Sequence, residues 1–64
     1  MDQDRLKEIY RAERILFIIE ECNDILTDLY EQITDREFKE ARKNSEELIK
    51  EIKIIIKLIE KDDF

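Results

Sequence analysis

The sequence predicts an all-α fold: a two-helix antiparallel hairpin that dimerises into a four-helix bundle. The chain of 64 residues contains no glycine and no proline, which disfavours sheet folds because their tight hairpin turns need positive backbone φ angles. Charged residues make up 47% of the chain and hydrophobic residues 42%, a combination typical of long amphipathic helices. Apolar residues also recur every three or four positions, which is the period of one helix face.

Association is the expected source of stability. A chain of this length builds at most one small core, and such chains usually need disulfides, a metal or oligomerisation. Cys22 is the only cysteine, so no disulfide forms within the chain. With one thiol and no histidine, neither a zinc site nor any cofactor is expected. A second copy of the chain is therefore the expected partner.

The first helix is expected over about residues 3–32, after Asp2 as its N-cap. Its first apolar stripe comprises Leu6, Ile9, Ala12, Leu16, Ile19, Asn23, Leu26, Tyr30 and Ile33, and its second comprises Ile15, Ile18, Cys22, Ile25 and Leu29. Together the stripes are wider than the seam of a two-stranded coiled coil. Asn23 is either a buried residue that fixes the register of association or a solvated residue at the edge of the face.

A turn is expected at Thr34. Thr34 and Glu37 match the S/T-x-x-E capping box, and Ile33 and Phe38 stand at the positions of a hydrophobic staple. Both signals make Thr34 the N-cap of a second helix. Two alternatives stay open: one continuous helix, and a second helix that starts at Asn44. The hairpin is favoured because a lone helix buries little apolar surface.

The second helix is expected over about residues 35–61, within a single domain that spans residues 1–64. Its main stripe comprises Phe38, Ala41, Ser45, Leu48, Ile52, Ile55 and Ile59, with Ile49 and Ile56 on one margin and Ile54 and Leu58 on another side. One partner helix can cover only one of these sides. Folding back at Thr34 places residues 15–19 opposite roughly 49–53, with both stretches apolar on their outer sides. We therefore expect a second hairpin to dock there as a two-fold homodimer.

The expected oligomer interface draws on both helices and consists of Ile15, Leu16, Ile18, Ile19, Cys22, Leu26, Leu48, Ile52, Ile55, Ile56, Leu58 and Ile59. This plan resembles that of the Rop family, in which a short hairpin dimerises into a four-helix bundle and binds RNA. The resemblance is one of architecture and carries no sequence motif. With a net charge of −6, direct binding of a nucleic acid is not expected, because its phosphates repel an acidic protein.

Acidic residues gather on one side of the first helix. The carboxylate ridge, as we name it, consists of Glu20, Asp24, Asp28, Glu31 and Asp35. Like charges at this spacing cost a few tenths of a kcal/mol per pair, so helix stability does not explain the ridge. Three explanations of the ridge stay open: a solvated face, a row that pairs with basic residues of the other helix, and a contact for a basic partner. The cross-helix partners would be Lys39, Arg42, Lys43 and Lys50.

Catalysis and membrane insertion are not expected. Without histidine, catalytic triads and histidine-based acid–base chemistry are absent. Cys22 falls on the apolar face, where a buried thiol is inert packing rather than a nucleophile. No apolar run of about 18 residues is available to span a membrane. The first ten residues lack the basic start and apolar stretch of a signal peptide, so a cytoplasmic location is expected.

Two further resemblances concern function. Residues 45–49 read SEELI, similar to the S-Q-E-L-D motif of small sporulation aspartyl-phosphate phosphatases, but Ile49 stands where that family has its Asp. The layout of residues 13–60 resembles the opening helices of HEPN toxins, whose R-x4-H nuclease motif needs a histidine. The favoured function is a non-enzymatic protein–protein interaction or regulatory module. The alternatives are an acidic, phage-type inhibitor that occupies the basic groove of a nucleic-acid enzyme, and a small phosphotransfer regulator or inactive HEPN-like relative.

Overall fold

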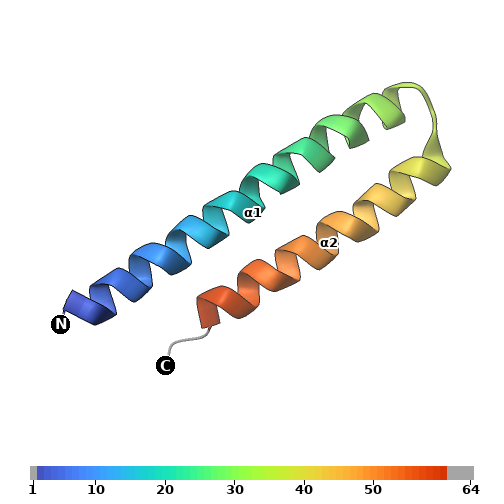
Figure 1. Ribbon diagram of the computed structural model, residues 1–64. Helices are drawn as coiled ribbons and strands as arrows, with labels where there is room; N and C mark the ends of the chain where they lie inside the picture. Colours follow the sequence, from blue (N-terminus) through green and yellow to red (C-terminus); the bar gives the residue numbers. More distant parts are fainter. Residues whose placement is uncertain (1, 61–64) are drawn as a thin grey trace.

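Two antiparallel helices that pack side by side make up the protein, as the computed structural model of residues 2–60 shows (Figure 1). Helix α1 spans Asp2–Thr34 and helix α2 spans Phe38–Glu60. The molecule is a narrow rod of 52 × 16 × 9 Å. The predicted all-α hairpin is confirmed, and neither a continuous helix nor a helix that starts at Asn44 is present.

A Schellman motif at the end of α1 reverses the chain through residues 35–37. The Glu37 amide donates to the Gln32 carbonyl at 2.7 Å. The Arg36 amide donates to the Ile33 carbonyl at 3.1 Å. These are the two hydrogen bonds that define the motif. Arg36 has a φ of 61° and thus adopts the left-handed conformation that glycine usually supplies at this position.

Thr34 lies at the turn as expected, but it does not cap the second helix. Its hydroxyl donates to the Tyr30 carbonyl at 2.8 Å, and Thr34 is the last residue of α1. The N-cap of α2 is Glu37, whose carbonyl accepts the first helical hydrogen bond from the Ala41 amide at 3.0 Å. The predicted capping box is wrong, because the Glu37 amide that it needs is already bonded to the end of α1. Consequently α2 begins at Phe38, three residues later than expected.

The intrachain seam is the line along which α1 and α2 face each other. It consists of Arg11, Ile15, Ile18, Cys22, Ile25, Leu29 and Gln32 from α1 and of Ala41, Asn44, Leu48, Glu51, Ile55 and Leu58 from α2, all buried or half-buried. The most buried are Ile18, Cys22 and Ala41, at 4–8% exposure. Because α2 can cover only one side of α1, only one of the two apolar stripes of α1 is buried. The buried stripe is the second one, and the first stripe is exposed.

Polar side chains close the intrachain seam at both ends. At the open end of the hairpin, Arg11 Nη1 donates to the carbonyls of Leu58 at 3.1 Å and Ile59 at 3.5 Å. A cation there satisfies carbonyls at the C-terminal end of α2 and complements the helix dipole. Near the turn, Asn44 Nδ2 donates to Gln32 Oε1 at 2.9 Å. Most of the apolar packing therefore lies between these two contacts, and the buried Ala41 packs on the turn side of Asn44.

The pairing of residues across the hairpin differs from the expected one by about one helical turn. Glu51 lies beside Glu21 and Cys22, whereas residues 15–19 were expected opposite roughly 49–53. The reversal is centred near Arg36 rather than Thr34. Moving the centre of a hairpin by two residues moves the facing residue by about four, which is one turn.

Over the described residues, α1 with 33 residues is longer than α2 with 23. Because Arg11 is level with Leu58 and Ile59, residues 3–10 of α1 extend past Glu60, where the described part of α2 ends (Figure 1). At 1.5 Å per residue, this N-terminal extension is on the order of 12 Å long. It carries Leu6 and Ile9, both nearly half exposed.

Candidate functional site

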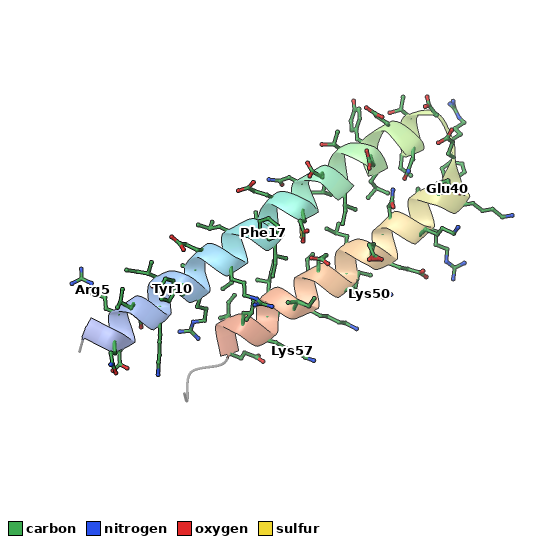
Figure 2. All side chains as sticks on the ribbon, viewed as in Figure 1. Arg5, Tyr10, Phe17, Glu40, Lys50 and Lys57 are labelled. Carbon is green, nitrogen blue, oxygen red and sulfur yellow. The ribbon has the colours of Figure 1, made fainter. Side chains whose placement is uncertain are left out.

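An apolar surface is left uncovered along the length of the hairpin. We name it the open apolar face; it consists of Ile9, Leu16, Ile19, Leu26, Tyr30 and Ile33 from α1 and of Ile49, Ile52, Ile56 and Ile59 from α2. Each of these side chains is at least 40% exposed. Figure 2 shows side chains projecting from both helices away from the seam. A small monomer rarely exposes a continuous apolar surface of this size unless something binds there.

Both halves of the open apolar face lie on the same side of the hairpin. Where the two helices lie side by side, each residue of the open apolar face comes directly after a seam residue in the sequence. Ile19 follows Ile18, for example, and Ile56 follows Ile55. One residue further along a helix is a rotation of about 100°. The two helices run in opposite directions and face each other across the seam. One step along either helix therefore turns the side chain toward the same side of the pair. The uncovered stripes therefore form one surface and not two.

The opposite side of the hairpin is mostly charged. Its members precede seam positions by one residue, and the apolar ones include Phe17 and Ile54. A hollow of about 380 Å³ separates them, lined by Arg14, Phe17, Ile18, Glu21, Glu51 and Ile54. The second apolar patch predicted on the second helix is thus divided, since Leu58 lies in the seam and Ile54 on this charged side.

The predicted oligomer interface is divided between two surfaces. Its members on the open apolar face are Leu16, Ile19, Leu26, Ile52, Ile56 and Ile59. Its members in the intrachain seam are Ile15, Ile18, Cys22, Leu48, Ile55 and Leu58. The sequence shows one wide apolar face on each helix, and the hairpin itself uses about half of that width. The exposed members remain available to a second chain.

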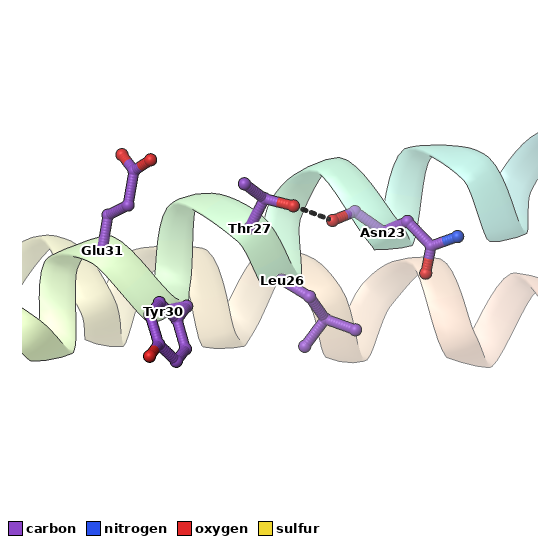
Figure 3. Close-up of a pocket in the computed structure, with 5 residues that line it drawn as sticks. All are labelled: Asn23, Leu26, Thr27, Tyr30 and Glu31. Carbon is purple, nitrogen blue, oxygen red and sulfur yellow. Dashed lines mark hydrogen bonds between the residues drawn. The ribbon is translucent and has the colours of Figure 1, made fainter.

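A shallow depression lies on the open apolar face near the turn. Asn23, Leu26, Thr27, Tyr30 and Glu31 line about 590 Å³ of it (Figure 3). It continues along the helix past Leu26 and Tyr30 to Ile33. The Thr27 hydroxyl donates to the Asn23 carbonyl at 3.0 Å and so is engaged within its own helix. Because the floor is aliphatic and aromatic, the depression suits apolar side chains better than a polar small molecule.

Asn23 is exposed in the hairpin, as the solvated alternative expects. It nevertheless lies among the residues of the open apolar face. A docked second chain would therefore cover it, and its role in fixing register stays a prediction.

Glu51 is the one carboxylate in the intrachain seam of the described chain. Burial raises the pKa of Glu51 above its ordinary value of 4.5, and the charge of Glu21, a hydrogen bond with Glu21 and the charge of Glu47 raise it further. Burial also raises the pKa of the Cys22 thiol, and the negative charges of Glu51 and Glu21 raise it further. A raised thiol pKa lowers the thiolate fraction, so Cys22 is poorly suited to be a nucleophile.

The carboxylate ridge is exposed to solvent. Glu20, Asp24, Asp28, Glu31 and Asp35 are all exposed. Within residues 2–60 none of them forms a salt bridge with the lysines and arginine considered above, and Arg42 instead pairs with Glu46 on its own helix at 3.6 Å. The cross-helix explanation of the ridge is therefore wrong. A solvated face and a contact for a basic partner remain.

Other kinds of site find no support in the described residues. Over residues 2–60, neither helix has the length and apolar character needed to cross a bilayer. The same stretch brings together no group of three His, Cys, Asp or Glu side chains that could hold a metal ion. Comparison of the chain with models of protein families, with curated proteins and with solved structures finds no match. Any functional proposal therefore rests on the geometry of the hairpin itself.

Proposed function

We propose that the chain is a non-enzymatic interaction module that works as a homodimer, in which two hairpins pack through their open apolar faces into a four-helix bundle. The observation that carries this proposal is the position of the uncovered stripes on one side of the molecule. A standard stable interface buries about 800 Å² per partner. Ten large side chains, each at least 40% exposed, provide an area of that order.

A second copy fits this face better than an unlike partner. Within residues 2–60 the buried side chains of the hairpin are only Ile18, Cys22 and Ala41, so a single copy has almost no core. Domains of this size need an additional source of stability. A partner that stabilises the folded state must be present whenever the chain is made, and a second copy meets that condition.

Sedimentation equilibrium at micromolar concentration tests the homodimer. The expected mass is twice the 7.9 kDa of one chain, with circular dichroism showing a highly helical protein at the same concentration. A helical, folded monomer would reject the proposal.

The carboxylate ridge supports a second candidate function, the binding of a basic protein surface. Asp24, Asp28 and Glu31 each precede a seam position by one residue, which puts them on the side away from the open apolar face. A homodimer would leave them accessible. A row of exposed, unpaired carboxylates resembles a nucleic-acid backbone in charge and suits the basic groove of a nucleic-acid enzyme.

Charge reversal tests this second candidate. The triple change of Asp24, Asp28 and Glu31 to lysine is expected to abolish pull-down of a basic nuclease. A matched control reverses Glu8, Glu13 and Glu60, which lie outside the ridge and are also exposed. If the ridge variant and the control bind the nuclease equally well, the ridge is only a solvated surface.

The phosphotransfer alternative has less support. Ile49 stands where the similar phosphatase motif has its Asp, and it is exposed on the open apolar face beside Ile52 and Ile56. This is the placement of a packing residue. Neither phosphoryl transfer nor RNA cleavage is proposed for this chain.

A further inference from the structure

Two copies of this hairpin can pack face to face with two-fold symmetry in two ways. With both turns at the same end, α1 of one copy lies against α2 of the partner. With the turns at opposite ends, α1 lies against α1 of the partner, and the two run antiparallel. We propose the second arrangement, in which the N-terminal extension of each copy binds the turn end of α1 in the other. This inference rests on the proposed homodimer and specifies its contacts.

The unequal lengths of the helices distinguish the two arrangements. Leu6 and Ile9 lie in the N-terminal extension, past the described end of α2, and are 47% and 46% exposed. With both turns at the same end, the extension faces a partner α2 whose described part ends at the same level, so the described residues of α2 cover neither side chain. With the turns at opposite ends, the extension lies along the partner's α1, which runs the full length of the rod. Only this arrangement covers the whole open apolar face of α1.

The surface that would receive the extension is the depression near the turn. Leu26, Tyr30 and Ile33 line it and are exposed. They are spaced by four and three residues along one face of α1, which lets side chains from two antiparallel helices interlock. In the opposite-end arrangement, the aliphatic side chains of the extension lie level with this depression. The extension and the depression are therefore complementary parts of one contact, made twice in the dimer.

Charge also favours turns at opposite ends. Residues 21–49, the half of the hairpin that holds the turn, carry nine acidic and four basic side chains, a net charge of −5. The remaining described residues, 2–20 and 50–60, carry seven of each, a net charge of zero. Turns at the same end place two halves of −5 side by side. Turns at opposite ends place each acidic half beside a neutral one, which lowers the repulsion at moderate ionic strength.

A distance between turns tests the arrangement. Asp35→Cys is spin-labelled on a Cys22→Ala background, and the distance between the two labels in the dimer is measured by pulsed electron paramagnetic resonance. With the turns at opposite ends it is expected to be roughly 40–50 Å, from the helical rise over the length of the rod. With the turns at the same end it is below about 25 Å, because only two or three helix diameters separate the labels.

The outcomes separate this inference from the proposed function. A dimer with the short distance overturns the arrangement and leaves the homodimer intact. A folded monomer, which gives no signal between chains, overturns both. Circular dichroism of the labelled protein checks that Cys22→Ala has kept the helical fold.

A second measurement avoids changes in the seam. The change Ile9→Ser is expected to raise the dimer dissociation constant more than about tenfold, because a half-exposed aliphatic side chain loses its cover in each copy. The control is Tyr10→Ser, in the same extension but on the charged side of α1, which is expected to change it less than about threefold. Equal dissociation constants for Ile9→Ser and the unaltered chain would overturn the inference, since the extension would then contact nothing.

Discussion

The intrachain seam and the open apolar face run side by side along both helices, and only the seam is covered. Arg11, Gln32, Asn44 and Glu51 occupy positions in the seam. The open apolar face is aliphatic along α2, from Ile49 onward. Each surface supplies apolar packing, but the chain itself covers only one of them. The comparison teaches that folding of this hairpin depends on what covers the other surface.

A pair of isoleucines on α2 provides the sharpest way to break this comparison. Ile52 and Ile54 are 43% and 41% exposed, but Ile52 lies on the open apolar face and Ile54 on the charged side. Ile52→Lys is expected to abolish the dimer and lower the free energy of unfolding by about 3 kcal/mol, because it places a charge in a buried interface. Ile54→Lys is expected to cost less than about 1 kcal/mol, as surface changes do.

Urea unfolding and sedimentation of the two variants measure these effects. If Ile54→Lys destabilises the protein as much as Ile52→Lys does, the two sides of the hairpin are equivalent. The distinction between them would then have no energetic meaning.

Concentration sharpens the same comparison without any substitution. If the open apolar face is covered by a second copy, a tenfold rise in protein concentration contributes about 1.4 kcal/mol to the folded dimer. For a dimer of two such chains this raises the Tm by roughly 5 °C. Thermal unfolding followed by circular dichroism over a hundredfold range of concentration measures the shift. A Tm that does not vary with concentration would mean that the seam alone holds the fold.

The smallest expected effect concerns the carboxylate in the intrachain seam. The pKa of Glu51 in the fold is raised above its ordinary value of 4.5. The protonated side chain of Glu51 therefore contributes to stability below pH 4.5, and this contribution is lost as the pH rises through the raised pKa. Glu51→Gln is therefore expected to raise the Tm at pH 7. The gain should vanish below pH 4.5, where the native carboxyl is protonated as well.

Thermal unfolding of Glu51→Gln at several pH values measures this difference. Glu13→Gln, at an exposed position of α1, is the control for removing one negative charge. A gain for Glu51→Gln that is the same at every pH, or one matched by the control, would show that the charge in the seam is not its cause.

Much of the fold could be predicted from the spacing of apolar residues. The two stripes of α1 were visible in the sequence, and so was the need for more than one partner surface. Which stripe faces α2 could not be predicted, because Ile18 and Ile19 are chemically identical. The choice depends on the direction in which the turn sends the chain. That direction is set by the backbone of residues 35–37, where no glycine marks the left-handed position.

The candidate site was predictable only in part for the same reason. Leu16, Ile52 and Ile59 were expected at an interface and are exposed on the open apolar face. Glu51 was not singled out, because a lone glutamate in a charged helix resembles its solvated neighbours until the opposite helix is in place. The N-terminal extension was also missed, since its existence depends on where α2 ends relative to Arg11.

The left-handed arginine in the turn has a consequence for how this chain tolerates substitution. Inside a helix, glycine costs about 1 kcal/mol relative to alanine, so almost every position of the rod is harmed by it. At residue 36 the backbone already adopts a φ of 61°, which glycine adopts without steric strain and a side chain with a Cβ does not. A glycine scan of the chain would thus record losses along both arms and a gain at a single point, and that point would mark where the polypeptide doubles back.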